Sequence, residues 1–244
     1  MNDAASLYII RAYEMPQEPG VARVHDTAAV PGGAGDLNYL GNIEVLQNGW
    51  YSLWTQHTLF SAFFFLPAQL SVFCAWQWRL EHTGHNWNRF MTAPVDIECL
   101  YLAKLIVAAG VSVLAQACIG ALFLLGGTLA GLKGPFPQEL WNWLGWGALG
   151  GLAVCAVQLL LSLIIRSFAV PVGMGLLGGV VGMLAMAKGW GYSFPYALLP
   201  LGMRANDPER LLSPPLFALS CAAYIALFAA AAICVLRRRD VTAD

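Results

Sequence analysis

Charged side chains are scarce in this chain. They make up 11% of its 244 residues, whereas hydrophobic residues make up 58%, and the mean hydropathy is +0.61. Soluble domains carry about 25% charged residues, so an ordinary soluble domain is excluded. The formal net charge of −1 also excludes a strongly basic surface that would attract nucleic acid. The composition predicts an all-α, polytopic integral membrane protein.

Signature motifs of nucleotide binding and catalysis are missing. The sequence contains no G-x-x-x-x-G-K-[ST] phosphate loop, no G-x-S-x-G nucleophile elbow, no zincin motif and no acidic pair within an apolar run. We therefore predict no catalytic residue, no metal site and no cofactor in this chain. The cysteines form no C-x-x-C pair, which favours small buried residues over metal ligands or disulfides. They are Cys74, Cys99, Cys118, Cys155, Cys221 and Cys234.

Long apolar runs are abundant, and a spanning helix needs about 20 mostly apolar residues. Five runs are predicted to span: Leu53–Trp76, Leu105–Leu129, Leu144–Ile165, Phe168–Ala187 and Leu216–Leu236. Residues 1–50 contain no comparable run, and Met1–Gly35 lacks the apolar core of a signal peptide. The expected organisation is a leading segment over 1–50 followed by a transmembrane domain over 51–240.

Basic residues near the span ends indicate which side each loop occupies. Arg237, Arg238 and Arg239 follow the last span directly, and such residues favour the cytoplasmic side. We therefore expect the C-terminus, the short link at Arg166 and the loop over 79–104 in the cytoplasm. With five spans, residues 1–50 and the proline-rich loop over 188–215 then lie outside.

Residue types within and beside the spans predict packing. Glycines from Gly173 to Gly182 recur at three- and four-residue spacing, which is typical of a close helix–helix contact, although a span that is simply rich in glycine is an equal alternative. Prolines prevent a continuous helix over 188–215, but the apolar Tyr192–Met203 predicts a pair of short helices dipping back into the outer leaflet. Tryptophans near the span ends are expected to anchor at the membrane interface. They are Trp76, Trp78, Trp87, Trp141, Trp143, Trp146 and Trp190.

Polar residues inside the spans are few. Gln69, Gln116 and Gln158 can line a substrate path or bond to a neighbouring helix, and helix–helix bonding is the simpler interpretation. His57 falls near the outer end of the first span, where we expect a hydrated, interfacial side chain.

The stretch from Glu81 to Pro94 is polar and separates two apolar runs. Taken as a helix, Leu80–Met91 places Leu80, Gly84, Trp87 and Met91 on one arc. The opposite arc is polar and consists of His82, His85, Asn86 and Arg89. This pattern predicts an amphipathic helix on the membrane surface, although a simple solvated connector is the alternative. A metal site at Glu81, His82 and His85 is not favoured, because no further ligand is nearby in sequence.

A second helix is expected after the polar stretch. Pro94 suits a first helical position, and Asp96 and Glu98 follow in or near the first turn, where acidic residues interact well with the helix dipole. Lys104 is placed where the next span enters the membrane, and its ammonium is expected to reach back to the surface.

The run from Glu81 to Lys104, EHTGHNWNRFMTAPVDIECLYLAK, resembles the cytoplasmic segment of type-2 ABC transporter permeases. At the level of span layout the resemblance extends over about residues 40–240. The subgroup that it resembles most contains bacteriocin and lantibiotic immunity permeases and antibiotic exporters. The residues that match the pattern are Glu81, Gly84, Trp87, Pro94, Val95, Leu102, Ala103 and Lys104.

The resemblance implies a permease subunit that pairs with a second permease and with two cytosolic ATPase subunits, which bind ATP and Mg²⁺. It implies a location in the bacterial inner membrane and export of an amphiphile such as a peptide antibiotic or drug. The loop would carry the helix that couples to the ATPase, with Trp87 as its membrane anchor. The residues expected to take part in this coupling are Glu81, His82, His85, Asn86, Trp87, Arg89, Pro94 and Lys104.

Other interpretations of the chain and of its function stay open. The family has six spans, so a chain with five is expected either to follow a start codon assigned too late or to be a shortened permease. A membrane-embedded enzyme acting on lipid through His57, His82 or His85 is one alternative function. A non-transporting immunity or assembly protein, binding a peptide through 1–50 and 188–215, is the other.

Overall fold

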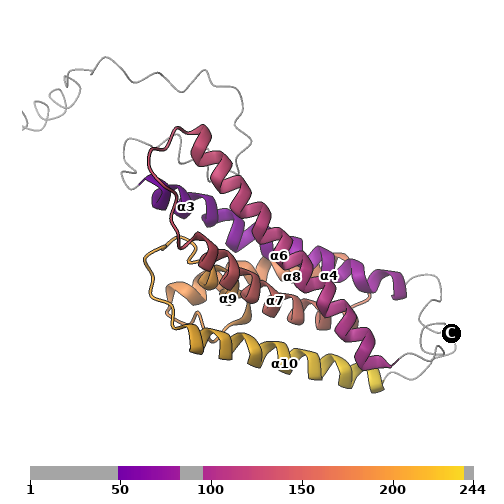
Figure 1. Ribbon diagram of the computed structural model, residues 1–244. Helices are drawn as coiled ribbons and strands as arrows, with labels where there is room; N and C mark the ends of the chain where they lie inside the picture. Colours follow the sequence, from indigo (N-terminus) through magenta and orange to yellow (C-terminus); the bar gives the residue numbers. More distant parts are fainter. Residues whose placement is uncertain (1–48, 83–95, 239–244) are drawn as a thin grey trace, which may run out of the picture. The chain divides into compact units, whose positions relative to one another are not determined.

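The computed structural model describes residues 49–82 and 96–238, and every regular element in these ranges is a helix. The described residues belong to one compact unit. Among them, five helical segments are long and apolar enough to cross a membrane (Figure 1). The predicted all-α, five-span architecture is confirmed.

The first span consists of three consecutive helical elements: α3 (Gly49–Phe60), the π-helical turn η2 (Ser61–Phe65) and α4 (Leu66–His82). The π turn comes directly before Pro67, which has no N–H to donate to the carbonyl of Phe63. Instead, the Leu66 N–H bonds to the carbonyl of Ser61, five residues back. A proline thus causes the local irregularity, and the helix continues on both sides of it.

The remaining spans are α6 (Ile97–Leu129), α7 (Leu140–Ile164), α8 (Ala169–Ala187) and α10 (Pro214–Arg238). Helix α6 has 33 residues, a length of about 50 Å, which exceeds the hydrocarbon thickness of about 30 Å. Asp96 is its N-cap residue and Glu98 lies in its first turn, as expected. The span starts at Ile97 rather than at the predicted Leu105, because its first polar turns are also helical.

Helix α7 lies at the centre of the bundle, where it packs against α4, α6, α9 and α10. In the most apolar window of α7, 67% of the residues are buried, compared with 33% for α6 and 17% for α10. In Figure 1, α6 runs diagonally across the bundle and α10 lies along its edge. The large apolar side chains exposed on α6 and α10 include Ile106, Leu114, Leu219 and Leu227, a surface suited to lipid.

The proline-rich segment contains one short helix, α9 (Pro195–Gly202), and all eight of its residues are buried. It packs against α7 and α8 inside the bundle (Figure 1). Trp54 donates to the Met203 carbonyl at 3.1 Å, which ties the end of α9 to the first span. The expected pair of short helices is therefore wrong in number, since α9 is the only helix described in this segment.

The glycines of α8 form a close-packed face, as predicted. A Cβ atom added to Gly179 would lie 2.1 Å from the carbonyl oxygen of Phe63, and one added to Gly178 would lie 2.6 Å from the ring of Tyr196. Gly175 is similarly crowded, Gly182 less so with its nearest neighbour at 3.0 Å, and nothing lies within 4 Å of such an atom on Gly173. Only glycine allows α8 to approach the first span and α9 this closely.

Candidate functional site

A nearly buried ion pair joins the ends of the two helices that flank the segment 83–95. The ammonium of Lys104 in α6 lies 2.7 Å from the carboxylate of Glu81 in α4. The same ammonium donates to the Gln77 carbonyl at 2.5 Å. The side chains of Lys104 and Glu81 are only 11% and 13% exposed. The ends of α4 and α6 are therefore held together by a salt bridge with little access to water.

Trp78 packs against the Lys104 side of this ion pair. Its ring is 0% exposed, and the Lys104 ammonium lies 4.5 Å from the ring centroid, within the range of a cation–π interaction. Two expectations are wrong here. Lys104 does not extend to the surface, because Glu81 and Trp78 already satisfy its charge, and Trp78 is a core residue rather than an interfacial anchor.

Among the residues that the structure describes, several buried polar atoms in this part of α4 and α6 have no hydrogen-bond partner. They are Gln77 Nε2, Trp78 Nε1, Glu81 Oε2 and Tyr101 Oη. A buried polar atom without a partner destabilises a structure by about 1–3 kcal/mol. Polar atoms therefore gather beside the ion pair at this end of α4 and α6.

The remaining residues of the predicted coupling set fall into two groups. His82 ends α4, and its Nε2 lies 3.1 Å from the carbonyl oxygen of Ser162 in α7. Helix α4 continues without a break through His82, so the start of the expected surface helix belongs to the first span. The other members lie outside the described residues, and their roles stay predictions; they are His85, Asn86, Trp87, Arg89 and Pro94.

A second polar cluster lies in the middle of the bundle around Gln158, which is 0% exposed. The amide orientation that satisfies its neighbours has the oxygen accepting from the Tyr196 hydroxyl at 2.8 Å and from the Ser71 hydroxyl at 2.9 Å. The same oxygen accepts from the Gly175 N–H, and the amide nitrogen donates to the Pro171 carbonyl. Gln158 thus joins α4, α8 and α9 to α7 through one side chain.

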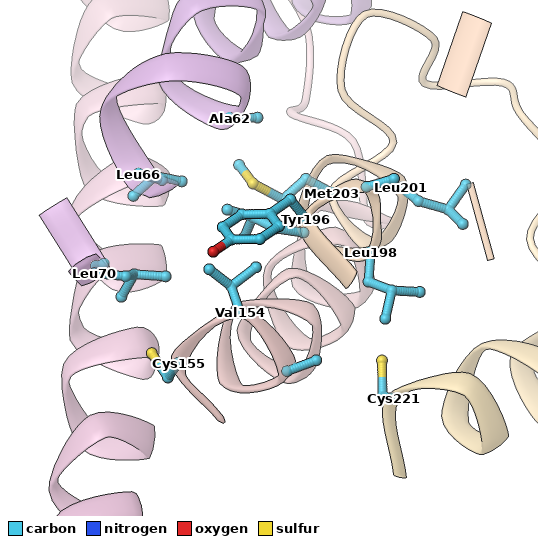
Figure 2. Close-up of a cluster of buried hydrophobic side chains, with 14 of the residues drawn as sticks. Ala62, Leu66, Leu70, Val154, Cys155, Tyr196, Leu198, Leu201, Met203 and Cys221 are labelled. Carbon is cyan, nitrogen blue, oxygen red and sulfur yellow. The ribbon is translucent and has the colours of Figure 1, made fainter. Parts of the chain in front are cut away.

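Tyr196 is the residue through which α9 contacts this polar cluster. Figure 2 shows its ring among buried apolar side chains, with the hydroxyl directed toward the side on which Leu66 and Leu70 lie. The ring also packs on Gly178. The sequence offered no sign that Tyr196 and Gln158 meet, because they are 38 residues apart and lie in different helices.

The other polar residues of the spans have different surroundings. Gln116 is 3% exposed and its Oε1 has no partner, whereas Gln69 is exposed. Among the described residues, Gln158 bonds to neighbouring helices, and a substrate path lined by the three glutamines stays a prediction. His57 is not a hydrated interfacial residue: it is 5% exposed, and its Nε2 lies 3.2 Å from the Ile119 carbonyl. Packing of α6 against the first span excludes water from it.

Within residues 49–82 and 96–238, no group of three His, Cys, Asp or Glu side chains is arranged to hold a metal ion. A comparison with protein families found one match: the model described as "ABC-2 family transporter protein" covers residues 27–182. This stretch is more than half of the chain and contains the first three spans and most of α8. Comparisons with curated proteins and with solved structures found no match.

Proposed function

The chain belongs to the ABC-2 family of transporter proteins and is a multi-pass permease subunit of an ABC transporter, and we propose that it exports an amphiphilic substrate. The substrate class is a peptide antibiotic or drug, moved outward across the bacterial inner membrane. A separate ATPase subunit supplies the energy, since this sequence contains no phosphate loop. A second permease, identical or homologous, completes the membrane part.

The observation that carries the coupling proposal is the Glu81–Lys104 ion pair. It connects α4 and α6 on either side of the segment 83–95. We propose that His85, Asn86 and Arg89 contact the ATPase and that Trp87 holds the segment at the membrane. Because the pair is largely buried, a force on this segment moves the ends of both helices together.

The substrate path is proposed to open by movement of α9. This helix enters the bundle from the end opposite the segment 83–95, and the Tyr196–Gln158 bond holds it against α7. Its eight residues are all buried against the described part of the chain, so α9 has to move before a substrate can pass beside it. The predominantly apolar surroundings favour an amphiphilic cargo over a highly charged one.

The proposal is tested by reconstituting the chain with an ABC ATPase subunit from the same cell. We expect the chain to stimulate ATP hydrolysis, and we expect Arg89→Ala and Glu81→Ala each to lower that stimulation without changing membrane insertion. The matched control is Lys133→Ala, because Lys133 is an exposed basic residue in the α6–α7 connection, at the opposite end of α6. Equal stimulation by the wild type, Arg89→Ala and Glu81→Ala would argue against ATPase coupling at this loop.

The two alternative functions give different results in the same preparation. A membrane enzyme acting on lipid would convert substrate with the purified chain alone. An immunity protein without transport activity would bind its peptide without nucleotide or an ATPase. Neither outcome is expected for a transport subunit whose substrate movement requires ATP hydrolysis on its partner.

A further inference from the structure

A pocket of about 200 Å³ lies between α4 and the link that joins α7 to α8. Residues 79 and 82 contribute to it from one face of α4, whereas Glu81 lies on the face that contacts α6. The pocket is thus separate from the coupling ion pair. Its polar lining residues are Arg79, His82, Ser162, Arg166 and Ser167.

The charged side chains that line this pocket are basic. Arg79 and Arg166 line it, and none of its lining residues within 49–82 and 96–238 is acidic. The guanidinium of Arg79 lies 5.3 Å from the centroid of the Phe168 ring, which keeps it beside the pocket. Arg166 is in the short link between α7 and α8, and it is exposed. Two guanidinium groups can therefore face one anion.

The pocket also contains a buried hydroxyl group that is not used elsewhere. Ser162 is 2% exposed, and its Oγ has no hydrogen-bond partner in the described structure. Since a serine in a helix usually bonds to a carbonyl one turn back, this orphan hydroxyl is unusual. It lines the pocket and is available to a ligand.

The start of α8 is a third feature of the pocket that favours an anion. Phe168 is the N-cap of this 19-residue helix and lines the pocket together with Ser167. The first N–H groups of a helix have no intrahelical partner, and the helix dipole makes this end partly positive. Such an end favours an anionic oxygen, and phosphate is the anion most often bound in this way.

We propose that this pocket binds a phosphate group. A phosphate has several acceptor oxygens, which match two guanidinium groups, a buried hydroxyl and a helix N-terminus. A volume of about 200 Å³ accommodates it, since one water occupies about 30 Å³. The group comes from a lipid headgroup or from a free phosphate compound, and these two sources share this chemistry.

The apolar part of the lining fits a lipid well. Ala75, Ile165 and Phe168 form this part of the wall, and apolar side chains of this kind suit contact with lipid chains. Basic pockets between transmembrane helices on the cytoplasmic side are a known mode of headgroup binding. A bound headgroup would connect α4 to the α7–α8 link. It would contact a different face of α4 from the one that carries Glu81 of the Glu81–Lys104 pair.

The test measures binding to the purified full chain in neutral detergent at about 0.15 M salt, where weak surface attraction is screened. The probes are dihexanoyl phosphatidylglycerol, dihexanoyl phosphatidylcholine and inorganic phosphate. The variants are Arg166→Gln, which removes one charge, and Ser162→Ala, which removes only the hydroxyl. The matched control is Arg238→Gln, because Arg238 is an exposed arginine at the end of α10 and does not line the pocket.

We expect phosphatidylglycerol or inorganic phosphate to bind, and Arg166→Gln to weaken that binding by about tenfold or more. Ser162→Ala should weaken it by about threefold to tenfold, and Arg238→Gln should change it by less than about twofold.

Tighter binding of phosphatidylglycerol than of inorganic phosphate identifies a lipid headgroup, and the reverse order identifies a free phosphate compound. Equal losses in Arg166→Gln and Arg238→Gln, or no binding of any probe, would overturn the proposal. Since Arg166 is exposed and in a link, its variant tests the pocket even if Ser162→Ala does not fold.

Discussion

At the residue scale, the most informative side chains are polar ones that the helices bury. Glu81 and Lys104 satisfy each other at 2.7 Å, and Gln158 is satisfied by groups from three other helices. Each of these residues joins segments that are distant in sequence. Polar side chains in a membrane bundle have no water as an alternative partner, so each bond also selects which helices are neighbours.

Replacing Lys104 by methionine should show what the ion pair contributes. Lys104→Met leaves the Glu81 carboxylate buried without its counter-charge, so we expect the free energy of unfolding to fall by about 2 kcal/mol, between the values for exposed and fully buried pairs. Lys104→Met combined with Glu81→Gln should recover part of this loss. Reversible unfolding in mixed micelles measures both effects.

The matched control is the exposed pair of Arg210 and Asp207, whose side chains are 36% and 46% exposed. Arg210→Gln should change the free energy of unfolding by less than about 1 kcal/mol, because water screens this pair. Similar losses for Lys104→Met and Arg210→Gln would contradict a special role for burial at the ends of α4 and α6.

At the element scale, close approach of backbones determines how α8 and the first span meet. The π turn before Pro67 leaves the Phe63 carbonyl without its usual helical donor. Gly179 of α8 lies directly against that carbonyl, where an added Cβ would have no room. The proline in the first span and the glycine in α8 therefore act together at this helix–helix contact.

Gly179→Ala is expected to destabilise the bundle by about 1–3 kcal/mol or to displace α8. The added Cβ would lie 2.1 Å from a backbone oxygen, which cannot rotate away as a side chain could. Gly173→Ala on the same helix is the control, since nothing lies within 4 Å of its added Cβ and alanine favours the helix by about 1 kcal/mol. Thermal unfolding of the two variants side by side measures the contrast. A neutral Gly179→Ala would mean that α8 does not approach the first span this closely.

At the scale of the whole molecule, the direction of each span follows from the membrane orientation. The basic cluster at the end of α10 predicts that this end is cytoplasmic, and the alternation of spans then places the segment 83–95 on the same side. The connection between α6 and α7 falls on the opposite side. The coupling proposal requires this orientation, because an ATPase can reach only the cytoplasmic loops.

Cysteine labelling in sealed vesicles of known orientation tests the topology. We expect His85→Cys to react with an impermeant thiol reagent only from the cytoplasmic face, and Lys133→Cys only from the outer face. Cys99, Cys118 and Cys234 are exposed and are first replaced by serine or alanine, so that only the introduced thiol reacts. Labelling of His85→Cys from the outer face alone would invert the topology and remove the basis for ATPase docking.

Several features could be predicted from the sequence. Apolar runs of sufficient length predicted the number and order of the spans, because a bilayer requires about 20 apolar residues per helix. The glycine spacing predicted the packed face of α8. The span limits were less accurate: α6 starts at Ile97 rather than Leu105, since helical geometry extends beyond the hydrocarbon while hydropathy reports only the apolar part. The coupling residues in 83–95 remain predictions.

The sequence by itself determined that this protein is a membrane bundle of helices, because hydropathy and helix length are local properties. Only the tertiary structure decided which residues lie inside it. Trp78 and Trp143 are buried while Trp76 and Trp141 are exposed, although all are tryptophans near span ends. Lipid is as apolar as a protein core, so both faces of a spanning helix have similar composition. The burial of α9 and the pairing of Glu81 with Lys104 depend on how the helices pack, which no local pattern records.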